Sequence, residues 1–315
     1  MRIEVRAQAR LHFGFLDLSG EQGRRFGGMG VSVDTPRLIL RMEPAKRLLV
    51  EGEQAERVEI LAARFCEAVE VRPEVRIRLV QTIPEHVGLG SGTQLALAVA
   101  AGLTRLKDLD LGPEEQCSVM NRARRSGVGY HLFQAGGFVV EGGHTVEGQK
   151  LGEAPPLLMR HEFPESWRIV VAVPVPTETI SGETEEAAFA RLGPASDQMV
   201  DQIARIVLMR LVPALVERNL DTFGAALTEA QELVGTCFAA VQNGLFHPDA
   251  AAVIARLKEA GARGVGQSSW GPAVYAFAGD EGEEQRLQDV ARRACPGGTV
   301  FTARGWNRGG VVEAL

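Results

Sequence analysis

Three glycines at alternate positions, Gly88, Gly90 and Gly92, stand directly before an apolar stretch with helical spacing. Glycine adopts positive φ and allows close approach to the backbone, so successive N–H groups in such a turn can point into one concavity. The following helix adds its positive end, and the hydroxyls of Ser91 and Thr93 are further donors. The pattern therefore predicts a phosphate-binding loop. It lacks the lysine of the P-loop pattern G-x-x-x-x-G-K-S/T, so it predicts another class of phosphate site.

A phosphate-binding loop of this kind lies between a strand and a helix. Residues 74–83 alternate apolar and polar, which predicts a half-buried strand, and residues 92–106 predict the helix after the loop. Residues 2–9 and 37–42 predict two more strands. Residues 112–126 predict another helix, because a proline and then two acids stand in its first turn.

Helical patterns dominate the second half of the chain. They cover about residues 183–192, 197–217, 220–235 and 280–294, with a buried strand over 167–176 and a final strand near 298–303. A strand-rich first half followed by a helix-rich second half predicts an α+β fold in two layers. We place a domain boundary at residue 160, which gives domains 1–160 and 161–315.

The composition argues against several functional classes. The 315 residues are 45% hydrophobic and 23% charged, which is typical of a folded globular protein. The net charge of −6 disfavours nonspecific binding to nucleic acids or membranes. There is no run of 18 apolar residues and no apolar leader, so neither a membrane span nor a secretory signal is expected. Four scattered cysteines without a C-x-x-C pair predict reduced thiols, no structural metal site and a cytoplasmic location.

Two segments resemble a known superfamily. PEHVGLGSGTQLALAVA resembles the P-x-x-x-G-L-G-S-S-x-A loop of the GHMP kinases, which comprise galactose, homoserine, mevalonate and phosphomevalonate kinases. GARGVGQSSWGPAVYAF is similar in place and character to that superfamily's third motif, a second glycine-rich turn beside the phosphates. The resemblance implies a GHMP-kinase-like fold over most of the chain.

One position departs from the kinase pattern. Those kinases carry S-G-x-D before a Gly-Gly strand, and the aspartate acts as base or charge partner at the accepting hydroxyl. Here Ser126, Gly127 and Val128 are followed by Gly129. Glycine can neither take a proton nor hold a cation, so phosphoryl transfer that relies on this carboxylate is expected to lose orders of magnitude in rate. The sequence therefore predicts a retained phosphate-binding loop without kinase chemistry.

Three segments together resemble one branch of the superfamily, the β-ribofuranosylaminobenzene 5′-phosphate synthases. They are ARLHFGFLDLSGEQGRRFGGMGVSVDTP (9–36), HVGLGSGTQ and GQSSWGPAVYAF. The family uses no ATP and condenses 4-aminobenzoate with phosphoribosyl pyrophosphate, releasing CO2 and pyrophosphate, early in methanopterin biosynthesis. The sequence does not separate 4-aminobenzoate from 4-hydroxybenzoate. The resemblance places pyrophosphate on the loop at 88–94, where N–H dipoles stabilise the charge that develops on the leaving group.

The resemblance also implies roles for particular residues. The catalytic candidates are Arg10, His12 and Asp17, and the substrate-binding candidates are Arg24, Gly88, Gly90, Ser91, Gly92, Thr93, Gln94, Gln267, Ser268 and Ser269. Arginine forks suit phosphate or carboxylate, and the two glutamines are candidates for the ribose hydroxyls. His12 is either a core histidine or a proton shuttle. Asp17 has three candidate roles: orienting an arginine, capping the turn at Ser19–Gly20, or holding Mg²⁺.

Two rival functions stay open at this point. One is an ATP-dependent small-molecule kinase that takes its carboxylate from Asp17 or Asp34, and the other is a non-catalytic ligand-binding protein. Mg²⁺ is compatible with a pyrophosphate substrate, which binds it through its own oxygens, but no protein ligand for a metal stands out and no ATP is expected. The resemblance implies a homodimer with small-molecule substrates, phosphoribosyl pyrophosphate and 4-aminobenzoate, and with no nucleic-acid or membrane partner.

Overall fold

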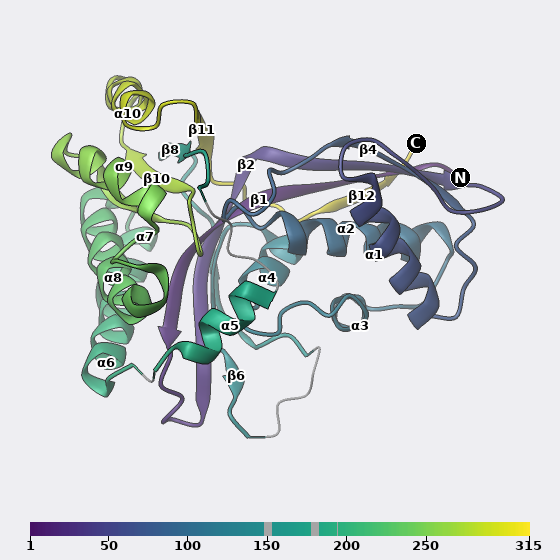
Figure 1. Cartoon of the computed structure of the whole chain (residues 1–315), viewed down its shortest axis with the longest axis horizontal. Helices are drawn as coiled ribbons and strands as arrows, with labels where there is room; N and C mark the ends of the chain where they lie inside the picture. The colour runs from purple at the N-terminus through teal and green to yellow at the C-terminus, as the bar shows by residue number, and fades with distance from the viewer. Residues whose placement is uncertain (148–152, 178–182, 194) are drawn as a thin grey trace.

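A computed structural model describes residues 1–147, 153–177, 183–193 and 195–315 of the chain (Figure 1). The strands are β1 (Ile3–Asp17), β2 (Arg24–Pro44), β3 (Leu49–Glu51), β4 (Val75–Gln81), β5 (Phe138–Glu141), β6 (His144–Thr145), β7 (Leu157–His161), β8 (Arg168–Val173), β9 (Arg263–Gln267), β10 (Val274–Ala278), β11 (Thr299–Arg304) and β12 (Val311–Ala314). The helices are α1 (Ala55–Ala68), α2 (Ser91–Leu106), α3 (Pro113–Val119), α4 (Val128–Ala135), α5 (Glu183–Arg191), α6 (Asp197–Ile206), α7 (Val212–Val216), α8 (Leu220–Gln242), α9 (Pro248–Glu259) and α10 (Glu281–Ala294), with a π-helical segment, η1 (Val207–Leu211), between α6 and α7.

A long antiparallel hairpin, β1–β2, joins the two halves of the molecule. In Figure 1 it runs from the side of α1 and α2 to the side of α6 and α8. The sequence predicted only the outer ends of these strands, because the glycine-rich stretch between them has low strand propensity. Glycine is required where the hairpin is most crowded: a Cβ placed on Gly30 would lie 2.4 Å from the carbonyl oxygen of Leu11. The hairpin therefore carries the N-terminal motif into the centre of the fold.

The first half is a sheet covered by helices. Among the described residues its main path is β12–β1–β2–β4–β3, and β5, β6 and β7 extend it beyond β2. Helices α1 and α2 pack together beside β1 and β2. The last strand, β12, returns to pair with β1, which brings the two chain ends close together in Figure 1. The domain boundary at residue 160 stays a prediction, but this return ties the end of the chain to the first sheet.

The second half is a four-stranded sheet, β11–β8–β10–β9, in the described part of the chain. Ile169 and Val171 of β8 face the main core, whereas Val170 and Ala172 face a second core formed with α9 and α10. Burial on both faces explains why this strand reads as a continuous apolar run. The α+β class and the strand-rich and helix-rich halves are thus confirmed.

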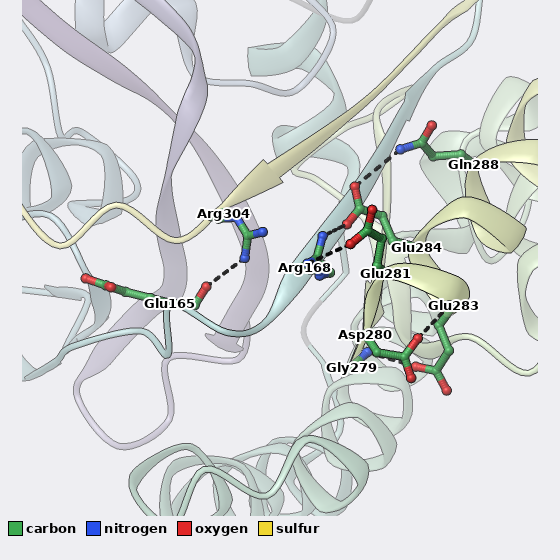
Figure 2. A network of polar contacts seen from close by, with 9 residues as sticks. All are labelled: Glu165, Arg168, Gly279, Asp280, Glu281, Glu283, Glu284, Gln288 and Arg304. Atoms are coloured by element: carbon green, nitrogen blue, oxygen red, sulfur yellow. Dashed lines mark hydrogen bonds and ion pairs between the residues drawn. The ribbon is translucent and has the colours of Figure 1, made fainter.

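A network of ion pairs and hydrogen bonds holds α10 to the edge of the second sheet (Figure 2). Arg168 of β8 pairs with Glu284 and lies 3.9 Å from Glu281, measured from Nη2 to Oε2. Glu281 and Glu284 both belong to α10, and their carboxylates lie beside the guanidinium of Arg168. The positive charge of Arg168 is therefore balanced by negative charge next to it. The hydrogen bond to Glu284 raises the pKa of Arg168.

One predicted helix ends early. The predicted helix over 112–126 stops at Val119, because Asn121 and Ala123 adopt left-handed φ values of 52° and 59°. The residues that follow form a loop rather than a solvated helical face. This correction matters for function, because the loop enters the cleft described below.

In the part of the chain that the structure describes, no helix combines the length and apolarity needed to cross a membrane. Cys66, Cys117, Cys237 and Cys295 are free thiols, as predicted.

Candidate active site

A basic cleft lies at the N-terminal end of α2. Gly88 and Gly90 have φ values of 89° and 78°, and α2 begins at Ser91 immediately after them. The first N–H groups of a helix have no partner within the helix, so this end of α2 presents donors to the cleft. The cleft measures about 1500 Å³, including the solvent at its mouth.

Three segments that are far apart in the sequence meet at the loop. Ser268 Oγ donates to the carbonyl oxygen of Gly88 over 2.6 Å and accepts from the backbone N–H of His12 over 2.9 Å. Arg10 Nη1 donates to the same Gly88 carbonyl over 2.6 Å. A Cβ on Gly88 would lie only 2.2 Å from the Ser268 carbonyl oxygen, so glycine is needed for this close approach. The phosphate loop is therefore held rigidly between β1 and the turn after β9.

Positive charge far exceeds negative charge on the cleft wall. Among the described residues that line it, the arginines are Arg10, Arg57, Arg64, Arg122, Arg124 and Arg125, and the acid is Glu186. Arg124 pairs with Glu186 over 3.2 Å, and the guanidinium of Arg125 stacks 4.5 Å from the ring centroid of Phe189. Both partners belong to α5, which thereby borders the cleft.

The other arginines crowd around the first turn of α2. A Cβ placed on Gly92 would lie 2.9 Å from Nη2 of Arg57 and 4.0 Å from Nη1 of Arg122. Nε of Arg122 is buried without a hydrogen-bond partner. Burial, together with the charges of Arg57 and Arg64, lowers the pKa of Arg122 to about 10. Arg57 is paired with Glu85, but that single carboxylate leaves the cluster strongly cationic. Such a cluster is suited to a ligand with several negative charges.

Sequence reasoning missed this cluster. Arg57 and Arg64 are seven residues apart on α1, which places them on one face of the helix, and Arg122 lies in the loop after α3. The spacing of the first pair was a readable signal. The third arginine, Arg122, was not expected in the cleft, because the sequence predicted that it lies within a helix over 112–126.

The structure sorts the predicted residues into four groups, the last of which, Asp17 and Arg24, is described in the next paragraph. Those that line the cleft are Arg10, His12, Gly88, Gly90, Ser91, Gly92, Thr93 and Ser269. Ser268 and Gln94 lie behind the wall: Gln94 is buried, and its Nε2 donates to the carbonyl oxygen of Gly129 over 2.9 Å. Gln267 lines a neighbouring apolar pocket rather than the cleft. The catalytic and binding roles of these residues stay predictions.

Asp17 and Arg24 lie away from the cleft. Asp17 Oδ1 accepts from the backbone N–H groups of Ser19 and Gly20, over 2.7 and 3.0 Å, so of its three predicted roles the structure shows the turn cap. Arg24 donates from Nε and Nη2 to the carbonyl oxygens of Gly142 and Gly143, over 2.7 and 2.6 Å. Its guanidinium holds the β5–β6 turn, so these contacts fit a structural role for Arg24 better than a phosphate contact.

A buried hydrogen-bonded chain leads from the cleft into the core. The N–H of Gly14 donates to Nδ1 of His12 over 3.1 Å, so in the neutral ring the proton lies on Nε2, which is 2.9 Å from Ser126 Oγ. Ser126 in turn hydrogen-bonds to Glu141. Burial, and then the charge of Arg10, lower the pKa of His12 to about 3, so the imidazole is neutral at physiological pH.

Glu141, the acid at the end of this series of hydrogen bonds, is fully buried. Glu141 accepts from the backbone N–H groups of Gly127 and Gly143 over 3.2 and 2.7 Å. Burial outweighs these hydrogen bonds and raises the pKa of Glu141 to about 7. The sequence does not single out Glu141, because it is one polar position at the end of a short strand.

Position 129 lies tightly against the side chain of Thr93. A Cβ on Gly129 would lie 3.0 Å from Cγ2 of Thr93, so an aspartate there would require the threonine to shift. The second serine of the kinase pattern is likewise replaced by Gly92, next to the Arg57 guanidinium. Within the described residues, no three His, Cys, Asp or Glu side chains are grouped to hold a metal ion.

The fold and the anion-binding cleft define a protein of the GHMP kinase type. Family models described as GHMP kinases N terminal domain and GHMP kinases C terminal match residues 56–137 and 211–297. Homoserine kinase from Cytophaga hutchinsonii shares the fold, with a TM-score of 0.65 and 17% identity over 99% of this chain and 97% of that one.

Curated relatives then narrow the assignment. The chain is 33% identical to the β-ribofuranosylphenol 5′-phosphate synthase of Archaeoglobus fulgidus over 99% of both chains. It is 31% identical to the enzyme of that name from Methanothermobacter thermautotrophicus over 97% of both. The chain therefore belongs to the β-ribofuranosylphenol 5′-phosphate synthase family. The predicted synthase family, and the prediction that the chain is an enzyme, are thereby confirmed; the relatives' names specify a phenol where the sequence predicted an aminobenzene.

Proposed function

We propose that this enzyme joins phosphoribosyl pyrophosphate to a para-substituted benzoate and releases pyrophosphate and CO2. The observation that carries the proposal is the arginine cluster at the first turn of α2, where Arg57, Arg64 and Arg122 lie together and one carboxylate, that of Glu85, pairs with Arg57. Pyrophosphate is the most highly charged part of the donor. A preorganised set of cations and N–H dipoles stabilises it most strongly as it leaves, when its charge is greatest.

The proposed reaction needs no net proton transfer. The C1–oxygen bond of the ribose breaks, and its electron pair leaves with pyrophosphate. The ring carbon that bears the carboxylate forms a bond to C1, and the electron pair of the bond to the carboxylate then restores aromaticity as CO2 departs. The absence of a carboxylate at Gly129 is compatible with this chemistry, because no strong base has to act on an accepting hydroxyl.

Each part of the cleft has a role in the proposal. The amides of Gly92 and Thr93, with Arg57 and Arg122, bind pyrophosphate. Arg10 of β1 reaches the loop, and in the proposal its guanidinium attracts the carboxylate of the acceptor. His12 lies beside Arg10 and is neutral, so it supplies a dipole rather than a second positive charge.

The finer points of the prediction belong to the same proposal. Both 4-hydroxybenzoate and 4-aminobenzoate are acceptors to test, since the relatives' names specify a phenol, the family that the three segments resemble uses the amine, and the sequence does not separate the two. An early step of methanopterin biosynthesis, a cytoplasmic location and a homodimer are retained as predictions. Mg²⁺ is expected to arrive on the oxygens of the pyrophosphate donor.

The test follows the carboxyl carbon. Purified protein is incubated with phosphoribosyl pyrophosphate and either benzoate carrying a radiolabelled carboxyl group. We expect labelled CO2 and pyrophosphate in equal amounts, and no pyrophosphate when the benzoate is omitted. If neither product forms although the donor binds, the protein acts as a ligand-binding protein; transfer of the γ-phosphate of ATP to any acceptor would instead identify a kinase.

A further inference from the structure

A second pocket opens beside the basic cleft and differs from it in chemistry. Its apolar walls come from Phe15 of β1, Val234 and Phe238 of α8, and Phe246 and Trp270. Within the described residues, no Asp, Glu, Lys or Arg lines this pocket. Its volume is about 420 Å³ including its mouth, compared with about 1500 Å³ for the cleft. These features suit an uncharged ring and exclude a phosphate.

The pocket and the cleft share one wall. His12, Phe15, Ser269 and Trp270 line both. A ring inside the pocket therefore has one edge at the junction, next to the place where the donor's ribose extends from the pyrophosphate site. Because the proposed reaction forms a carbon–carbon bond between ring and ribose, the acceptor has to lie at such a junction.

The aromatic walls are arranged to contact a flat ring. Phe15 and Phe238 lie 6.0 Å apart between ring centroids at an interplanar angle of 24°, and Phe238 meets Trp270 edge-on at 4.9 Å and 89°. Aromatic side chains in these geometries bind a further ring by stacking on one face and by edge contacts on another.

Three buried glutamines, together with His12 and Ser269, form the polar lining of the pocket. Gln267 Nε2 donates to Gln242 Oε1 over 3.2 Å and to the carbonyl oxygen of Ser269 over 3.0 Å. Gln242 Nε2 donates to the carbonyl oxygen of Leu245 over 2.9 Å, and Gln231 Nε2 to that of Phe13 over 2.7 Å. An amide nitrogen carries two hydrogens, and Nε2 of Gln231 and of Gln242 each donates one hydrogen bond in this network, so each of these two side chains retains one donor for a further polar group.

We propose that this pocket binds the aromatic ring of the acceptor, with the carboxylate at the junction beside Arg10 and the para hydroxyl or amino group against the glutamines. The assignment rests on the proposed function for the identity of the acceptor. It separates the two substrates by charge: the cleft takes the polyanionic donor, and the pocket takes the apolar ring. Selectivity for the para substituent then resides in Gln231 and Gln242, away from the arginines.

The test fills the pocket and measures each ligand separately. Val234→Phe adds a ring to a wall that only the pocket uses, and Leu233→Phe, on the adjacent and partly buried position of α8, is the matched control. Binding of labelled 4-hydroxybenzoate and 4-aminobenzoate is measured by equilibrium dialysis, and binding of phosphoribosyl pyrophosphate by calorimetry. We expect Val234→Phe to weaken binding of the benzoates at least tenfold and to change donor binding less than twofold. Leu233→Phe should change neither by more than twofold.

A second variant covers the case in which the larger side chain prevents folding. Val234→Ala enlarges the pocket and should improve binding of 4-hydroxy-3-methylbenzoate relative to 4-hydroxybenzoate at least threefold. If benzoate binding is unchanged in folded Val234→Phe, or this ratio is unchanged in Val234→Ala, the pocket assignment is wrong. The dialysis measurement does not depend on turnover, so it tests the pocket separately from the reaction. If the wild-type protein fails to bind the donor or to release CO2, the proposed function is wrong instead.

Discussion

Two arginine-containing regions of this molecule differ in how their charge is balanced. On the outer side of the second sheet, Arg168 has Glu284 and Glu281 beside it (Figure 2), and the hydrogen bond to Glu284 raises its pKa. At the first turn of α2, Arg122 is partly buried near Arg57 and Arg64, and its pKa is lowered to about 10. The first region is balanced within the chain, whereas in the second the carboxylate of Glu85 pairs with one of three arginines, and in the proposed function pyrophosphate supplies further negative charge.

The difference separates a structural role from a binding role. A balanced network stabilises the folded chain modestly, because each ion pair has to offset the desolvation of its members. An unbalanced cluster stores repulsion that is relieved only when an anion binds. Excess charge, rather than the number of arginines, therefore marks the site.

Removing two members of the unbalanced cluster should have the largest effect. We expect Arg57→Ala/Arg122→Ala to lower kcat/KM for phosphoribosyl pyrophosphate on the order of 1000-fold, because each charge-assisted hydrogen bond contributes about 2 kcal/mol. Thermal unfolding without ligand should occur at an equal or higher temperature than in the wild type, since like charges have been removed. Steady-state kinetics and calorimetry check both parts; a large loss of unliganded stability with normal KM would show that the cluster is structural.

The second largest expected effect is a pH dependence of stability that comes from the buried carboxyl group of Glu141. The pKa of Glu141 is raised from 4.5 to about 7 in the folded protein, so the folded state binds its proton more tightly than the unfolded state does. The resulting stability is fully present below pH 4.5 and is lost as the pH rises through about 7, a change on the order of 3 kcal/mol.

Glu141→Gln tests this directly. Chemical denaturation of both proteins between pH 5 and 8 should show the wild type losing stability relative to the variant as the pH rises. The difference between the two proteins isolates Glu141 from histidines that titrate in the same range. Parallel pH profiles would contradict the buried, carboxyl-centred hydrogen-bonded chain.

Restoring the kinase carboxylate should have a smaller effect. Gly129→Asp places a negative charge beside Thr93 and the pyrophosphate site, so we expect kcat/KM to fall roughly 10- to 100-fold through repulsion and crowding. Gly129→Asn carries the same bulk without the charge and should lose less. Product analysis with ATP should show no phosphorylated acceptor in either variant. If Gly129→Asp gained phosphoryl transfer, the aspartate would be the one feature that this site needs to act as a kinase.

The balanced region should matter least to activity. Arg168→Ala breaks its pair with Glu284, which should lower the Tm while kcat/KM changes by no more than about twofold. The two readouts are differential scanning calorimetry and the CO2-release assay. A loss of activity comparable with that of the cluster variants would remove the distinction between the two regions.

The sequence could predict what depends on local backbone chemistry. The glycine spacing at 88–92 and the change at Gly129 could be recognised in the sequence because each is a choice of residue type within a short pattern. The arginine cluster was not readable, because it forms only when α1, the loop after α3 and α2 come together. Asn121 was a usable signal, since asparagine is enriched in the left-handed conformation that ends a helix, whereas Ala123 gives no such signal. These two residues end the predicted helix, and Arg122 between them lines the cleft.

Arg24 is a motif residue whose contacts in the structure are with the backbone, and its predicted substrate contact stays a prediction. Its place within a family motif suggested a substrate contact, but its guanidinium is occupied by two backbone carbonyls of a turn. A motif selects residues for folding and for binding alike, and only the three-dimensional contacts separate the two.

The structure of the protein with phosphoribosyl pyrophosphate bound is the most direct test of the whole account. We predict the pyrophosphate on the amides of Gly92 and Thr93, between Arg57 and Arg122, with ribose C1 facing the junction at His12. Pyrophosphate bound elsewhere, with the cluster free of ligand, would contradict the claim that unbalanced positive charge marks the site of the leaving group.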